Sequence, residues 1–197
     1  MSFIINGTDL ETTGIDPEKG HRIVEIAIAR YITDDGEHFE KDGRTFTMRI
    51  NPKRSIDAKA QAVHGISQDM LVGCPTWEQA AREIHARLFD CHMLVAHNID
   101  FDIGFLLHEF TRVGIEPGNP ELFCTMQKGR GATPMGKIPN LGELCWATGV
   151  YYRREDAHAA DYDIDRTMEA LVNGARLGLF DLPVAVHDHL IKKGAFA

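Results

Sequence analysis

The sequence lacks the features that mark membrane-spanning and secreted proteins. Its 197 residues contain no uninterrupted run of about 18 apolar residues, the length that a membrane-spanning helix requires. No basic segment followed by an apolar one stands near residue 1, as a signal peptide would require. We therefore expect a cytoplasmic protein with no membrane contact. Repeats and low-complexity segments are absent as well, and the length predicts one domain with a sizeable core.

Cysteine is scarce and scattered. The chain has four cysteines and no C-x-x-C pair, which favours reduced and mostly buried thiols over disulfides or a zinc site. His187 and His189 are close in sequence but have no further ligand nearby, so we interpret them as surface residues. The four cysteines are Cys74, Cys91, Cys124 and Cys145.

Positive charge is also in short supply. The chain has 21 Lys and Arg against 29 Asp and Glu, a net charge of -8, whereas nucleic-acid-binding proteins usually carry a basic surface. Residues 127–154 depart from this balance, because Glu143 is their only acid. Such a segment is usually a solvated loop, and the alternative is a guide for a phosphate backbone. Its basic residues are Lys128, Arg130, Lys137, Arg153 and Arg154.

The order of the apolar segments predicts an α/β fold. Alternating apolar residues at 23–31 and 44–50 predict two strands of a meander, preceded by an apolar run at 3–5. The run at 93–96 leads directly into a helical pattern at 101–113, which is typical of an α/β unit. Further helices are predicted at 57–64, 76–89, 141–148 and 159–177, and a further strand at 122–126.

Two carboxylates after the first apolar run form the first candidate site. Asp9 and Glu11 are two residues apart, so a β-strand places both on one face. Two buried carboxylates are costly unless a partner offsets their charge, and a hard divalent cation is such a partner. For an isolated pair, an ordinary strand end followed by a polar turn is the alternative.

Helix geometry selects one inward-facing acid in each of two later clusters. Asp100 and Asp102 are about 200° apart around a helix, and only Asp102 is in line with the apolar stripe. In the last long helix Asp163 faces inward, whereas Asp161 and Asp165 turn away. For the first cluster, the alternative is that both acids only complement the dipole at the start of the helix.

A histidine precedes the last inward-facing acid. His158 lies five residues before Asp163, just ahead of the predicted helix. A lone histidine in such a place is more often a capping or surface residue. Its placement five residues before an inward-facing acid weakens that interpretation.

Three motifs occur in order along the chain. D-x-E-T-T-G is matched at residues 9–14, H-N-x-x-F-D at residues 97–102, and H followed five residues later by D at His158 and Asp163. Together they resemble the DEDD superfamily of 3'-5' exonucleases, in the histidine-type (DEDDh, DnaQ-like) branch that includes the DNA polymerase III epsilon exonuclease domains. The tyrosine branch has a tyrosine where this chain has Ala159. Many relatives have aspartate at the position of Cys124, a departure that bears on a local hydrogen bond and not on the catalytic set.

This resemblance implies a fold and a mechanism. The fold would be ribonuclease H-like, with helices flanking a central mixed sheet of five strands. Two Mg²⁺ ions, with Mn²⁺ as a substitute, would be held by carboxylates, and His158 would take a proton from the attacking water. The products would be nucleoside 5'-monophosphates. The implied metal ligands are Asp9, Glu11, Asp102 and Asp163.

The resemblance also places the terminal nucleotide of the substrate. Its base, sugar and backbone would meet residues near the first two motifs and near residue 64, through contacts that read no sequence. These residues are Leu10, Thr12, Thr13, Val63, His64, Asn98 and Phe101.

Three functions follow from the sequence as alternatives. The first is a DNA exonuclease of the proofreading or repair type, acting on a single-stranded 3' end. The second is an exoribonuclease of the ribonuclease T or oligoribonuclease type, because recognition of the 2'-hydroxyl depends on pocket shape. The third is an exonuclease-like binding module without activity, against which the complete set of acids argues.

The end of the chain bears on partners. We predict an exonuclease domain at residues 1–178 and a short tail at 179–197, with a replicative polymerase and a sliding clamp as candidate partners. Residues 176–180 resemble a clamp-binding sequence that ends in L-x-L-F. The simpler interpretation is a helix closed by Gly178, after which apolar residues fold back.

Overall fold

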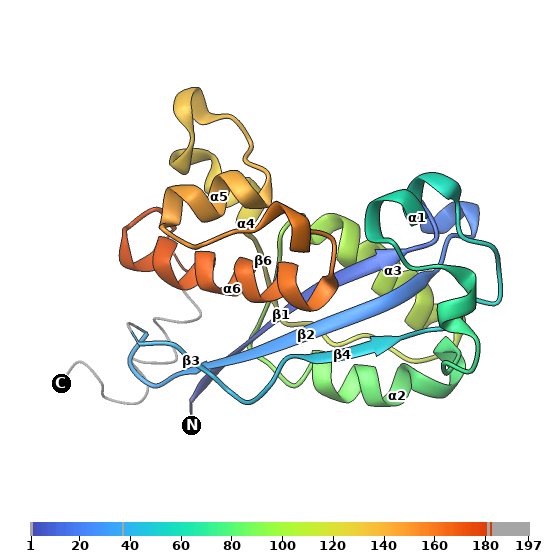
Figure 1. Ribbon diagram of the computed structural model, residues 1–197. Helices are drawn as coiled ribbons and strands as arrows, with labels where there is room; N and C mark the ends of the chain where they lie inside the picture. Colours follow the sequence, from blue (N-terminus) through green and yellow to red (C-terminus); the bar gives the residue numbers. More distant parts are fainter. Residues whose placement is uncertain (1, 37, 181, 183–197) are drawn as a thin grey trace.

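A computed structural model describes residues 2–36, 38–180 and 182 (Figure 1). One mixed sheet has the strand order β3-β2-β1-β5-β6, and β4 also pairs with β2. β2 is antiparallel to β1, whereas β5 is parallel to β1 and β6 to β5. The predicted mixed α/β sheet is therefore confirmed. The strands are β1 (Phe3–Thr12), β2 (Ile23–Thr33), β3 (Glu40–Lys41), β4 (Phe46–Arg49), β5 (Met93–Ala96) and β6 (Glu121–Cys124).

The sheet has one strand more than the predicted five. β3 pairs with Tyr31 and Ile32, and β4 pairs with residues 25–28 of the same strand. Two short strands therefore share one edge position of the sheet. Gly43 lies between them with φ 81°, in a left-handed conformation that interrupts a strand.

Helices cover both faces of the sheet. α6 packs on β1 and β2, and α5 packs on α6 (Figure 1). α2 and α3 contribute to a second core on the opposite face, around Leu10 and Ile26. Among the described residues no helix is long and apolar enough to cross a membrane. The helices are α1 (Ala58–His64), α2 (Trp77–Leu88), α3 (Ile99–Arg112), α4 (Thr125–Lys128), α5 (Leu141–Thr148) and α6 (Ala160–Arg176), with 3-10 turns η1 (Pro17–Lys19), η2 (Gln68–Leu71), η3 (Gly129–Ala132), η4 (Pro134–Gly136) and η5 (Arg154–Asp156).

Local capping explains where two of these elements begin. Thr76 and Gln79 form a capping box at the start of α2, in which the Thr76 N–H donates to Gln79 Oε1 over 2.9 Å. The strand predicted at 122–126 ends two residues early, because Cys124 Sγ accepts a hydrogen bond from the Gln127 N–H and caps α4.

β1 and α6 approach each other closely at Gly7. A Cβ atom there would lie 2.6 Å from Met168 Sδ and 2.7 Å from Ile164 Cδ1, so a larger residue would force these two side chains of α6 to move. Two residues later β1 carries Asp9, and the first turn of α6 carries Asp163. The close packing at Gly7 therefore lies near both acids along the chain.

The chain folds back after α6. Gly178 has φ 68°, and Phe180 is buried against Phe123 with ring centroids 5.8 Å apart. This agrees with the simpler interpretation of residues 176–180. Residues 181 and 183–197 of the predicted tail, including His187 and His189, lie outside the described residues.

Candidate active site

Four carboxylates gather where β1 ends and two helices begin. Asp9 and Glu11 come from β1, Asp102 from the first turn of α3, and Asp163 from the first turn of α6. Glu11, Asp102 and Asp163 are only 9%, 3% and 8% exposed. Their neighbours Asp100 and Asp161 are exposed, so the structure buries the acid that helix geometry selects in each cluster.

Burial raises the pKa of all four carboxyls, and repulsion within the set adds to it at Asp9, Glu11 and Asp102. For Asp9, burial comes first and the charges of Asp163 and Glu25 follow. Burial and then Asp9 and Asp163 raise the pKa of Glu11 to about 9. Burial and the charge of Asp9 raise the pKa of Asp102, and burial raises that of Asp163. The four groups therefore resist ionising together.

No arginine or lysine of the described chain forms an ion pair with any of the four carboxylates. A fifth buried acid, Glu25, is directly opposite Glu11 on β2, and Arg49 Nε donates to Glu25 Oε2 over 2.8 Å. Sequence reasoning did not assign Glu25 to the site. Its signal was an acid inside the apolar strand pattern of residues 23–31.

The four carboxylates are suitable ligands for a hard cation, although they are not arranged as a metal site in this structure. In the part of the chain that the structure describes, no three His, Cys, Asp or Glu side chains already form a metal site. Four carboxylates without an internal cation are nonetheless the oxygen ligands that Mg²⁺ prefers. Because the charges of Asp9, Glu11 and Asp163 each raise the pKa of another carboxyl in the set, a divalent cation would relieve this repulsion.

His158 lies beside Asp163 in a left-handed backbone conformation. Its φ is 66°, and its N–H donates to Asp163 Oδ2 over 2.9 Å. The residue is exposed and lines a cleft together with Asp9 and Asp163. A free imidazole is therefore held beside the last acid.

Two tyrosines near Asp163 have different partners. The Tyr152 hydroxyl donates to Asp163 Oδ1 over 3.4 Å, a contact that the sequence did not indicate. The Tyr162 hydroxyl instead accepts from the Arg153 N–H over 2.6 Å. Tyr162 therefore does not serve the carboxylates, in agreement with a histidine-type site.

The second motif orders the start of α3. His97 Nδ1 is 3.1 Å from Thr125 Oγ1, and burial lowers the pKa of His97 to about 4. The imidazole is therefore neutral at pH 7 and ties β5 to α4. Asn98 follows with φ 89° and begins α3. The departure at Cys124 leaves a local hydrogen bond in place, from the Gln127 N–H.

Several predicted nucleotide contacts are engaged within the protein. The Thr12 hydroxyl donates to the Gly14 carbonyl over 2.6 Å, and the Thr13 hydroxyl accepts from the Arg22 N–H over 2.9 Å. His64 Nδ1 accepts from the Ile66 N–H, so Nε2 carries the proton and donates to the Thr12 carbonyl over 3.2 Å. These bonds shape the end of β1.

The other predicted contacts lie nearer the surface. Val63 is exposed, Phe101 is partly buried against Phe105, and Asn98 lines the cleft, whereas Leu10 is buried in the sheet. That these residues and the threonines meet a nucleotide stays a prediction.

The cleft has a volume of about 1270 Å³ and extends from the acids toward α5. Asp9, Asp163 and His158 lie on one side, and residues of α5 and of the segments around it form the rest. Lys137 and Arg154, two of the five basic residues between 127 and 154, line it. The basic segment therefore borders the candidate site.

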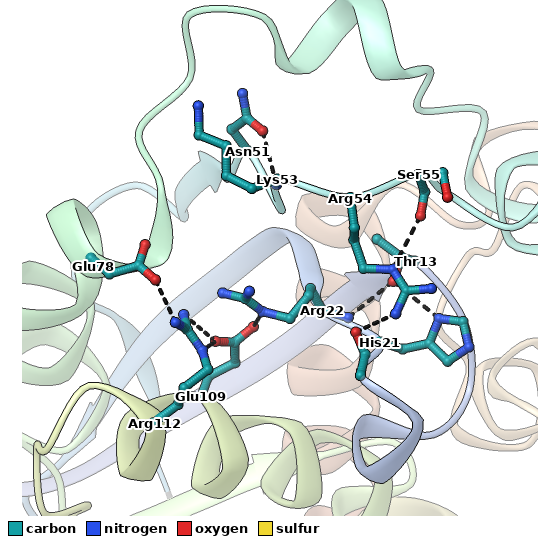
Figure 2. A network of polar contacts seen from close by, with 11 residues as sticks. Thr13, His21, Arg22, Asn51, Lys53, Arg54, Ser55, Glu78, Glu109 and Arg112 are labelled. Carbon is teal, nitrogen blue, oxygen red and sulfur yellow. Dashed lines mark hydrogen bonds and ion pairs between the residues drawn. The ribbon is translucent and has the colours of Figure 1, made fainter.

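A second set of buried charges lies farther along α3 (Figure 2). Glu109 is 1% exposed and is paired with Arg22 and Arg112, the latter over 2.9 Å. Arg112 also pairs with Glu78 of α2. Because the Arg22 N–H donates to Thr13, this network joins α3 to the segment that follows Glu11.

Comparison with known proteins gives consistent matches. The exonuclease family matches residues 7–171. The DNA polymerase III subunit epsilon of Pasteurella multocida is 30% identical over 205 residues, covering 96% of this chain and 78% of the relative. The 3'-5' exonuclease DinG of Bacillus subtilis is 33% identical over 159 residues, or 81% of this chain, which spans only 16% of that protein.

Solved structures support the same fold. Exonuclease X in complex with 5' overhanging duplex DNA matches with a TM-score of 0.64 and 23% identity, covering 90% of this chain and 94% of that one. The predicted ribonuclease H-like fold is confirmed. The chain therefore belongs to the exonuclease family, and within it to the 3'-5' exonucleases related to DNA polymerase III epsilon, as the three motifs predict.

Proposed function

We propose that this 3'-5' exonuclease depends on two divalent cations, Mg²⁺ or its substitute Mn²⁺, and removes mononucleotides from single-stranded 3' ends of DNA. The observation that supports cation dependence is the set of four carboxylates, three of them buried and Asp9 half-buried, that no arginine or lysine of the described chain neutralises. Buried acids in such a set stay protonated or need an external cation. The proposal that DNA is the substrate rests on the relatives that are named as DNA polymerase subunits.

The chain's own residues divide the work. Asp9, Glu11 and Asp163 would hold one cation, and Asp9 and Asp102 the other. Bound divalent cations supply a nucleophilic water and neutralise charge on the phosphate oxygens. His158 accepts the proton of that water on its imidazole, which faces the cleft.

The same relatives suggest a partner. Because they are named as polymerase subunits, a replicative polymerase is the candidate to which this chain would bind. A clamp is less suited to residues 176–180, because docking there would expose the buried ring of Phe180.

A nuclease assay tests the reaction. Purified protein is given Mg²⁺ or EDTA and matched DNA and RNA oligonucleotides, with either the 3' or the 5' end blocked. We expect Mg²⁺-dependent release of nucleoside 5'-monophosphates from DNA that a 3' block prevents. Faster release from RNA would assign an exoribonuclease, and no release from either would leave a binding module.

A test of the role of His158 requires a variant that keeps the left-handed backbone conformation at this position. Asparagine tolerates the left-handed conformation, so His158→Asn preserves the N–H bond to Asp163 better than alanine does. Loss of a general base lowers the rate by about 10² to 10⁴-fold. A decrease of less than about tenfold would remove His158 from this role.

A further inference from the structure

Two large aromatic side chains stand in solvent on one wall of the cleft. Trp146 of α5 is 85% exposed and Tyr151, just beyond the helix, is 75% exposed. Both line the cleft that contains Asp9 and Asp163. The other tryptophan, Trp77, is fully buried in the core. Aromatic rings left in water beside a catalytic centre indicate a binding surface.

The wall is held rigidly. Asn140 and Glu143 form a capping box at the start of α5, and Leu144 and Cys145 anchor the helix in the core. Beyond the helix, the Val150 N–H donates to the Cys145 carbonyl over 2.8 Å. Trp146 and Tyr151 therefore project from a fixed support, which lowers the entropy cost of stacking on them.

Charge on this wall complements a polynucleotide. Arg154 lines the cleft and forms no ion pair with any described residue, while Lys137 is paired with Glu143. Single strands are bound by aromatic rings that stack on bases and by cations that contact phosphates. A duplex offers no free base faces, so this wall fits unpaired nucleotides.

We propose that Trp146 and Tyr151 stack on the bases of the single strand immediately 5' of the nucleotide being removed, with Arg154 at its phosphates. This subsite rests on the proposed function, because it takes the same strand whose 3' end enters the carboxylate site. With this subsite, a good substrate must have several unpaired nucleotides at its 3' end, so that the strand reaches the wall. A mononucleotide occupies only the carboxylate site and does not reach Trp146.

Tryptophan fluorescence reports this contact directly, without turnover. In EDTA, a short oligothymidylate or oligouridylate is expected to quench the emission of Trp146, whereas thymidine 5'-monophosphate is not. Trp146→Phe leaves only the buried Trp77 and is expected to abolish the quenching. Equal quenching by the monophosphate and the oligonucleotide would overturn the proposal.

Affinity distinguishes stacking from a merely structural role. Trp146→Ala should weaken oligonucleotide binding on the order of tenfold, and Trp146→Phe should restore most of it, because a phenyl ring still stacks. Leu177→Ala is the control, an exposed apolar residue at the far end of α6 that should change nothing. Unchanged affinity in Trp146→Ala would refute the subsite.

The two proposals fail differently. If the wild type releases mononucleotides but Trp146→Ala binds and degrades oligonucleotides normally, only the subsite is wrong. If the wild type shows no nuclease activity but oligonucleotides still quench Trp146, the subsite stands and the reaction is wrong.

Discussion

Asp102 and Glu109 are buried on the same helix, seven residues apart, yet they are partnered in opposite ways. Glu109 is paired with Arg22 and Arg112 (Figure 2), whereas Asp102 is repelled by the charges of Asp9 and Glu11 and forms no ion pair with an arginine of the described chain. A buried charge is stable only when it is paired or neutralised. Among the described residues, the fold thus supplies positively charged partners for the acid near one end of α3 and none for the acid at the other end.

Removing a carboxylate should have its largest effect at the unpartnered set. Asp9→Asn and Asp163→Asn should each lower the rate of mononucleotide release by more than about 100-fold, because loss of groups that only support ligands already costs about 10 to 100-fold. The melting temperature in EDTA should stay or rise, since one source of repulsion is gone. An Asp163→Asn protein with near wild-type activity would refute the metal assignment.

The opposite result is expected at Glu109. Glu109→Gln leaves Arg22 and Arg112 without their shared carboxylate, and we expect a loss of about 3 kcal/mol in the free energy of unfolding. Glu78→Gln is the matched control, because Glu78 is an exposed partner of the same Arg112 and should cost less than about 1 kcal/mol. Equal stability of the two variants in urea denaturation would contradict the view that Glu109 depends on its two arginine partners.

The dependence of stability on pH provides a further test of the unpartnered carboxylates. The pKa of Glu11 is about 9 in the folded protein against 4.5 for an unperturbed glutamate, so between these values the folded state binds more protons than the unfolded state. Stability in EDTA should therefore fall as pH rises from about 5 to about 9, by up to about 1.4 kcal/mol per pH unit for one such group. Saturating Mg²⁺ or Glu11→Gln should flatten the slope in calorimetric melting. A slope unaffected by either would show that Glu11 is not the responsible group.

Tyr152 should give the smallest change. Its hydroxyl is 3.4 Å from Asp163 Oδ1, a long hydrogen bond whose loss is worth about 0.5 to 1 kcal/mol. Tyr152→Phe should therefore lower activity only a few-fold and shift the Mg²⁺ concentration for half-maximal rate. A loss of activity as large as that in Asp163→Asn would mean that Tyr152 takes a direct part in the reaction.

The inward-facing acids could be predicted because they follow local periodicity. Asp102 and Asp163 are selected over Asp100 and Asp161 by helix geometry alone, and motif order then joins them to Asp9. Contacts set by tertiary packing could not be predicted. Neither the Arg49 partner of Glu25 nor the approach of Tyr152 to Asp163 has a local signal, since their partners are 24 and 11 residues away.

The basic segment at residues 127–154 shows the same limit of what the sequence can predict. Composition indicated a solvated loop, with a guide for a phosphate backbone as the alternative, and the structure places Lys137 and Arg154 on the cleft wall. The exposure of Trp146 had no counterpart in the sequence, because a tryptophan in a short apolar helix is usually buried. Exposure depends on which face of α5 packs on α6.

The absent side chain at Gly7 leaves room for the side chains of Met168 and Ile164 between β1 and α6. If the proposed cations bind, we expect the spacing of Asp9 and Asp163 to depend on this packing as well as on the acids. Gly7→Ala should widen that spacing and raise the activity with Mn²⁺ relative to the smaller Mg²⁺. An unchanged ratio would show that the core does not select the ion.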